Sequence, residues 1–153
     1  MQVLLGAGGD IGTFLAKELK PYTSKIRLVG RNPVKVNADD ELFPGDLLDA
    51  DRVNQAVAGA KVAYLVAGLK YDSRIWKKQW PVIMKNVIDA CVRNGSKLVF
   101  FDNVYMYDKT AIPHMTEESA LNPPSEKGKV RREIVQLIEE ARTHRGCRPW
   151  IAR

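Results

Sequence analysis

Short apolar runs alternate with longer stretches of helical period along the chain. The apolar runs lie at residues 2–5, 26–29, 42–43, 62–66, 98–101 and 150–152. Runs of this length predict strands, and their nearly continuous hydrophobicity is typical of strands covered on both faces. Strands that alternate with helices form parallel βαβ units. The pattern therefore predicts an α/β fold, a doubly wound parallel sheet of about six strands with helices on both faces.

Three segments between these runs carry apolar residues on one helical face, which predicts that each face packs in the core. Their apolar positions are Ile11, Phe14, Leu15 and Leu19, then Ile83, Val87, Ala90 and Cys91, then Val130, Ile134, Leu137, Ile138 and Ala141. Gly95 is placed to end the second helix, and Ser125 is a suitable N-cap for the third.

Residues 102–124 show neither the helical period nor the short apolar runs of strands, and they end in Asn122-Pro123-Pro124. This pattern predicts a long loop over the carboxyl edge of the sheet, and loops of that length in a compact domain are usually functional. A chain of 153 residues with 45% hydrophobic content suffices for one domain, so we treat residues 1–153 as a single unit.

Composition narrows the range of partners and locations. The formal charge of +6 is spread over scattered lysines and arginines, which argues against a nucleic-acid surface. There is no apolar run long enough to span a membrane and no secretion signal, so we expect no membrane partner and a cytoplasmic protein. Cys91 and Cys147 lack paired spacing, so we expect reduced, structural cysteines and no metal site.

A glycine-rich segment, Gly-Ala-Gly-Gly-Asp-Ile-Gly at 6–12, follows the first predicted strand and opens the first predicted helix. Glycines at these places allow a tight turn, close approach to a pyrophosphate and close packing of helix on strand. The helix amino end then stabilises the phosphate charge. A purely structural turn is the alternative. The order of strand, glycine-rich segment and helix predicts a Rossmann-type NAD(P) site. This site includes Gly6, Gly8, Gly9, Asp10, Ile11 and Gly12.

The second predicted strand ends in Gly30-Arg31-Asn32, where an acid would bind the ribose hydroxyls of NAD. With a guanidinium in place of an acid, charge-assisted hydrogen bonds to a 2′-phosphate are favoured. Arg31 therefore favours NADP over NAD as the cofactor. The alternative is that Arg31 is a solvated turn residue.

At these residues the chain resembles the extended short-chain dehydrogenase/reductases, the NAD(P)-dependent epimerase/dehydratase family. The resemblance includes Asp46 and Leu47 after the third strand, where family members contact adenine, and Ala67 and Gly68 after the fourth, which lie along the cofactor. Members continue into a smaller carboxyl-terminal substrate domain, so the resemblance implies that this chain is the amino-terminal part of a longer protein.

The resemblance also marks three catalytic positions. Asn103 falls at the serine that binds the reacting oxygen, and Lys127 and Arg131 fall at the tyrosine and lysine of the Tyr-x-x-x-Lys motif. An asparagine amide can still polarise a carbonyl, although it cannot relay a proton as a hydroxyl does. Arg131 can keep a ribose or phosphate contact, and Lys127 can act only if its pKa falls.

Two functions follow from this combination. The first is an NAD(P)-dependent oxidoreductase or epimerase/dehydratase-like protein with an atypical active site, acting on a small-molecule carbonyl or alcohol substrate, with sugar nucleotides as one candidate class. The second is a non-catalytic NADP-binding redox sensor or regulatory module, which the missing tyrosine and lysine fit directly. The resemblance also allows a homodimer.

Overall fold

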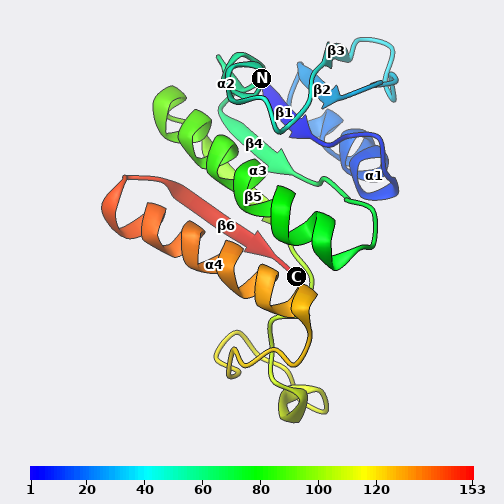
Figure 1. Ribbon diagram of the computed structural model, residues 1–153. Coiled ribbons are helices and arrows are strands. Elements are labelled where there is room, and N and C mark those ends of the chain that lie inside the picture. The colour runs from blue at the N-terminus through cyan, green and yellow to red at the C-terminus, as the bar shows by residue number, and fades with distance from the viewer.

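The computed structural model describes every residue from 1 to 153, and its centre is a six-stranded parallel sheet (Figure 1). The strands are β1 (Gln2–Leu5), β2 (Ile26–Gly30), β3 (Glu41–Pro44), β4 (Val62–Leu65), β5 (Lys97–Phe101) and β6 (Arg148–Ala152). They lie in the order β3-β2-β1-β4-β5-β6. This order is that of the Rossmann-type doubly wound fold, so the predicted fold class is confirmed.

The order places a switch point between β1 and β4. From β1 the chain first builds outward through β2 and β3, and then returns to add β4 on the other side of β1. Connections that leave in opposite directions open a crevice beyond the carboxyl ends of the two strands, and such crevices bind ligands in open α/β sheets. The glycine-rich segment 6–12 follows β1 at this crevice.

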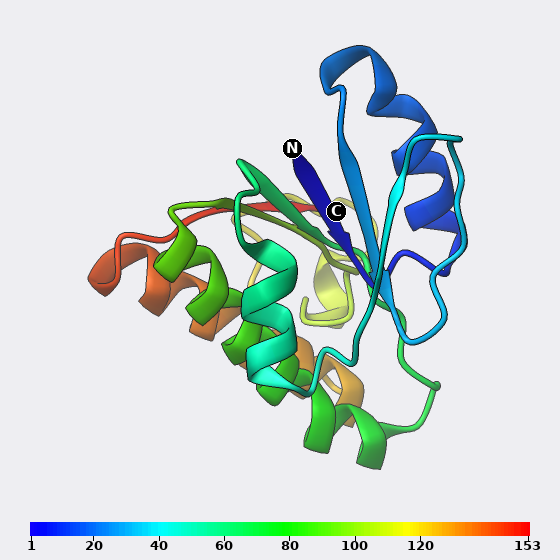
Figure 2. The same ribbon diagram turned by 90° about the horizontal axis from the view of Figure 1, so that it is seen from above.

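Helices cover the sheet unequally (Figure 2). Helices α2 (Ala50–Val57), α3 (Ser73–Asn94) and α4 (Glu126–His144) pack on one face, where 25 buried residues form the main core. Helix α1 (Asp10–Glu18) lies on the other face, with a smaller core of 6 buried residues. Single 3₁₀ turns occur at Lys20–Tyr22 and Lys109–Ala111.

The predicted helix ends and two of the three apolar stripes are confirmed. Gly95 caps α3 in the left-handed region with φ of 64°, and Ser125 caps α4 by accepting a hydrogen bond from the Gly128 amide at 3.0 Å. The α3 and α4 stripes belong to the main core. The sequence reasoning did not predict α2, which has only 8 residues.

The expected core stripe of α1 is partly wrong. Ile11 is 52% exposed and Phe14 is 67% exposed, whereas Leu19 is buried. The residues of α1 that are buried within the helix are Gly12 and Ala16, whose small size lets the helix approach β1 closely. The small residues Gly12 and Ala16 therefore set the rotation of this helix, and Ile11 and Phe14 turn toward solvent.

Strand β6 also departs from the expected burial on both faces. Leu98 and Phe100 of β5 lie in the main core, so Val99 and its β6 neighbour Trp150 point to the opposite face. The one helix on that face, α1, packs over β1 and β2. Trp150 is consequently 70% exposed.

The segment from 102 to 125 is a long loop that extends beyond the carboxyl edge of the sheet, as predicted (Figure 1). It has its own small core of Met106 and Tyr107 against Val135 of α4. Cys91 and Cys147 are buried free thiols, and burial raises the pKa of Cys91 to about 12. None of the helices is long and apolar enough to cross a bilayer.

Candidate functional site

Two glycines of the segment 6–12 are required by close contacts. Gly6 has φ of 89°, and a Cβ there would lie 2.4 Å from the Cα of Ala67. A Cβ on Gly12 would lie 2.7 Å from the carbonyl oxygen of Ala7. No larger residue fits at either place without displacing backbone, so these glycines hold β1, the end of β4 and the start of α1 together.

The start of α1 has free amides. Its N-cap is Gly9, which offers no side chain to cap the helix. None of the backbone amides from Gly8 to Gly12 donates a hydrogen bond within the chain. A Cβ on Gly8 or Gly9 would meet no atom within 4 Å, so the space beside these two residues is open. Free amides at a helix amino end, reinforced by its dipole, are suited to a phosphate group.

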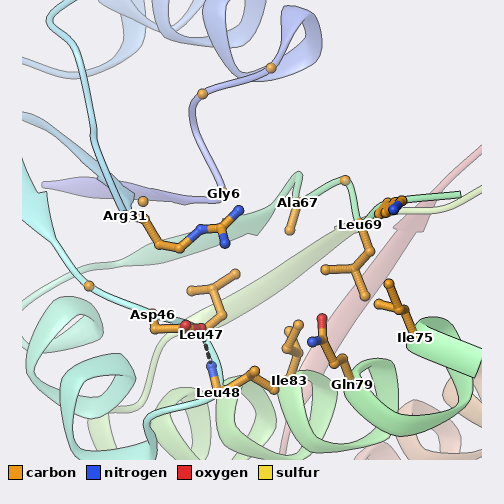
Figure 3. A pocket seen from close by; sticks show the side chains of 16 residues that line it. Gly6, Arg31, Asp46, Leu47, Leu48, Ala67, Leu69, Ile75, Gln79 and Ile83 are labelled. Carbon is orange, nitrogen blue, oxygen red and sulfur yellow. Dashed lines mark hydrogen bonds between the residues drawn. The ribbon is translucent and has the colours of Figure 1, made fainter. Parts of the chain in front are cut away.

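A cavity of about 520 Å³ lies along the carboxyl edge beside this turn (Figure 3). It begins at Gly30, the last residue of β2, and at Arg31, passes the glycine turn, and reaches Lys70 after β4. Asp10, Ile11 and Gly12 do not line it. Eight of the predicted cofactor residues do: Gly6, Gly8, Gly9, Arg31, Asp46, Leu47, Ala67 and Gly68.

Arg31 extends over the cavity from the end of β2 (Figure 3). Its side chain is exposed and makes no hydrogen bond or ion pair within the chain. A guanidinium without a partner is available for an anionic ligand, and its planar donors suit a phosphate. The geometry therefore fits the expected contact with a 2′-phosphate.

The loop after β3 is fixed from two sides. Asp46 accepts a hydrogen bond from the Leu48 amide at 2.9 Å, drawn in Figure 3. The carbonyl of Leu47 accepts one from the buried side-chain amide of Asn86 on α3 at 3.0 Å. This support holds the Asp46-Leu47 pair at the cavity, where the resemblance expects an adenine contact.

Sequence reasoning missed the contribution of α3 to the cavity. Ile75, Gln79 and Ile83 line it, together with Leu69 and Lys70 from the loop before the helix. The spacing of four between the three α3 residues places them on one helical face. That spacing is visible in the sequence. However, the apolar period predicted that Ile83 packs in the core, and it indicated no function for Gln79.

The three catalytic candidates lie outside the cavity lining. Asn103 follows β5, and its Oδ1 accepts a hydrogen bond from the Tyr105 amide at 3.1 Å, which leaves its own amide hydrogens without a partner. The ammonium of Lys127 lies 3.5 Å from the centroid of the Tyr71 ring. Lys127 thus lies beside Tyr71, the residue after Lys70. Asn103 is hydrogen-bonded to the backbone of Tyr105, whose ring lies 6.4 Å from that of Tyr71. The catalytic roles of Asn103 and Lys127 stay predictions.

Arg131 lies in the interior. It is 5% exposed, and its guanidinium packs 4.1 Å from the ring centroid of Trp80 and 4.8 Å from that of Trp76. Its Nη1 is 3.5 Å from Asp102, whose carboxylate is fully buried and also 3.5 Å from Nε of Arg153. Burial raises the pKa of Asp102 and lowers that of Arg131. The structure thus joins Arg131 to Asp102 rather than to the cavity.

No three histidine, cysteine, aspartate or glutamate side chains gather in a way that could hold a metal ion. The open polar groups of the site are amides, the Arg31 guanidinium, the Asp46 carboxylate, the Lys70 ammonium and Gln79. Such a set recognises the phosphates, ribose and base of a dinucleotide, so the residues present fit NAD(P).

Solved structures share this fold. Glucuronic acid dehydrogenase from Chromohalobacter salexigens superposes with a TM-score of 0.85 at 16% identity, over 97% of this chain and 57% of its own. UDP-glucose 4-epimerase from Brucella ovis in complex with NAD gives 0.84 at 16% identity, over 98% and 50%. Uronate dehydrogenase from Agrobacterium tumefaciens gives 0.80 at 19% identity, over 94% and 56%.

The chain thus spans about half the length of these solved structures. No curated protein sequence matches it significantly. A family model described as NAD(P)H-binding matches residues 6–136, which include the glycine turn, the cavity lining and the start of α4. Together with the free amides and the cavity, this match shows that the chain belongs to the NAD(P)H-binding family.

Proposed function

We propose that this chain binds NADP(H) and uses it in an oxidoreductase or epimerase/dehydratase-type reaction on a carbonyl or alcohol substrate. The observation that carries the proposal is the cavity at the carboxyl edge, which joins an unpaired arginine, the free amides of Gly8 and Gly9 before α1, and the loop after β4. This order matches the order of a dinucleotide from its 2′-phosphate through its pyrophosphate toward its reactive ring.

The cofactor supplies hydride chemistry when it is bound. The residues of this chain would bind and orient it: the amides at the start of α1 would hold the pyrophosphate, and Arg31 would hold the phosphate or hydroxyls of the adenosine ribose. Beyond the Lys70 end of the cavity, Asn103 has free side-chain amide hydrogens, which are suited to polarise a substrate carbonyl. Sugar nucleotides are the first substrates to test, because UDP-glucose 4-epimerase is among the similar structures.

Calorimetric titration with NADP and with NAD tests the cofactor part. We expect NADP to bind more tightly, and Arg31→Ala to weaken NADP binding by about tenfold or more through the loss of charge-assisted hydrogen bonds, with little effect on NAD. Arg132→Ala is the matched control, because Arg132 is an exposed arginine of α4 outside the cavity. Binding of neither cofactor would overturn the proposal.

A second function, a redox-sensing or regulatory module without catalysis, is favoured by one observation. The residue at the position of the catalytic lysine, Arg131, is buried against Asp102 and two tryptophans. Consumption of NADPH in the presence of a panel of carbonyl compounds separates the two functions. Turnover that falls in Asn103→Ala, with NADP affinity unchanged, supports the enzyme; tight binding without any turnover supports the sensor.

A further inference from the structure

An aromatic corner stands beyond the Lys70 end of the cavity, formed by Tyr71, Trp76 and Tyr105. The Tyr105 ring stacks on Trp76, with centroids 6.3 Å apart and planes 17° from parallel. Tyr71 meets Trp76 edge to face at 5.9 Å and Tyr105 at 6.4 Å. The three rings come from the loop after β4, the start of α3 and the loop after β5, so they gather where the carboxyl ends of neighbouring strands meet.

The base of this corner is rigid. Trp76 is 5% exposed, its indole N–H donates to the Lys70 carbonyl at 3.0 Å, and the guanidinium of Arg131 lies 4.8 Å from its ring centroid. The two tyrosines that rest on it are open: Tyr71 is 67% exposed and Tyr105 is 40% exposed. Exposed rings held on a buried, hydrogen-bonded support form a preorganised stacking surface.

A cation without a counter-charge completes the corner. Lys127 places its ammonium 3.5 Å from the Tyr71 ring centroid and makes no ion pair. The neighbouring acid, Glu126, pairs with Lys129, and the Asp102 carboxylate faces Arg131 and Arg153. Lys70 adds another positive charge at this end of the cavity. The net local charge is positive, which favours an anionic ligand.

The Tyr-x-x-x-Lys motif, which relays the proton in the family that the chain resembles, has no counterpart in this corner. The position of the family's tyrosine holds Lys127, and Asn103 donates hydrogen bonds without releasing a proton. Interaction with Tyr71 raises the pKa of Tyr105, so this phenol exchanges its proton less readily at neutral pH. A sugar alcohol or an isolated ketone needs a proton relay at the moment of hydride transfer. A conjugated quinone does not, because its reduced anion is stabilised over the whole ring.

We propose that the aromatic corner and Lys127 form a subsite for a planar, conjugated carbonyl compound of the quinone class that carries an anionic group. This inference rests on the proposed function and names its substrate class. The quinone accepts two electrons as a hydride from the reduced cofactor, which is oxidised in the same step. A proton from water then completes the hydroquinone. Asn103 and Lys127 stabilise the negative charge in the interval.

Binding is the first test, with 9,10-anthraquinone-2-sulfonate as the probe and NADP-saturated protein in the calorimeter. We expect Tyr105→Leu to weaken its binding about tenfold through the lost stacking surface, and Lys127→Gln about fivefold through the lost charge. Menadione, a neutral quinone, should respond to Tyr105→Leu but not to Lys127→Gln. Lys109→Gln removes an exposed lysine of the same loop and should change neither affinity.

Turnover is the second test, measured as NADPH consumption above the rate without protein. We expect the KM for the sulfonated quinone to rise in Lys127→Gln and the KM for menadione to stay constant. Circular dichroism and NADP affinity confirm that each variant is folded. Failure of both quinones to bind overturns this inference, as does turnover of UDP-glucose with inert quinones; either result leaves the proposed function standing. Loss of NADP binding by the unaltered chain would instead overturn the proposed function itself.

Discussion

At the scale of single residues, Arg131 carries a permanent charge into the interior of the chain. A guanidinium is more weakly hydrated than an ammonium and stacks on aromatic rings, so Trp76 and Trp80 compensate for part of its lost hydration. The Asp102 carboxylate contributes through its charge, although neither of its oxygens has a well-aligned hydrogen-bond donor. A lysine would lose the stacking, and the pair would be weaker.

This pair leads to a prediction about stability. Arg131→Met leaves the buried Asp102 carboxylate with Arg153 alone, and we expect a loss of about 3–5 kcal/mol in the free energy of unfolding at pH 7. Urea denaturation measures it. The double variant Arg131→Met with Asp102→Leu should recover most of the loss, because no buried charge remains. A single variant as stable as the double would contradict the prediction.

The pH dependence of that loss has a definite sign. Burial raises the pKa of Asp102 in the folded chain above its ordinary value, so between the two values the folded state binds more protons than the unfolded one. The contribution of this group to stability is therefore greatest at low pH and falls as the pH rises through the raised pKa. Without Arg131 the charged form of Asp102 is still less favourable. The loss in the free energy of unfolding caused by Arg131→Met should therefore shrink as the pH falls below 7.

At the scale of elements, the strands, α3 and α4 were predictable because their apolar period is long or continuous. Helix α2 was missed since a segment of 8 residues gives little period to detect. The rotation of α1 was also missed. The glycine at position 12 predicts close packing of the helix on the strand, but the apolar stripe placed Ile11 and Phe14 on the buried face instead. Similarly, nothing in the sequence indicates that Arg131 turns inward, since its direction depends on how α3 packs beside α4.

The tight contact of α1 on β1 gives a prediction for this element. Gly12→Ala puts a methyl group 2.7 Å from the Ala7 carbonyl oxygen, so α1 must shift. We expect a loss of about 1–3 kcal/mol in stability, together with weaker NADP binding as the free amides move. Gly8→Ala is the matched control for stability: a Cβ there meets no atom within 4 Å, and urea denaturation should show little change. Equal losses in the two variants would refute the argument.

At the scale of the whole molecule, the sheet divides the chain into two unequal halves. The face with α2, α3 and α4 holds the main core, and the face with α1 holds 6 buried residues over β1 and β2. The cavity lies at the carboxyl edge of the sheet, where the glycine turn before α1 and residues of α3 line it. Figures 1 and 2 show that α1 and α3 lie on opposite faces of the sheet. The sequence predicted the position of this cavity, because a glycine turn after the first strand fixes it.

Because no helix covers the Trp150 face of β6, the tryptophan fluorescence of the chain should separate into two components. Of its three tryptophans, Trp76 and Trp80 are 5% and 0% exposed, whereas Trp150 is 70% exposed. Fluorescence from the native chain should therefore contain one red-shifted component that acrylamide quenches steeply and one blue-shifted component that it barely reaches. Trp150→Phe should remove the quenchable component and leave emission from the two tryptophans that pack against Arg131. If steep quenching persists in that variant, Trp76 or Trp80 is open to solvent. With Trp150 removed, the remaining emission becomes a selective optical reporter of the interior beside the aromatic corner.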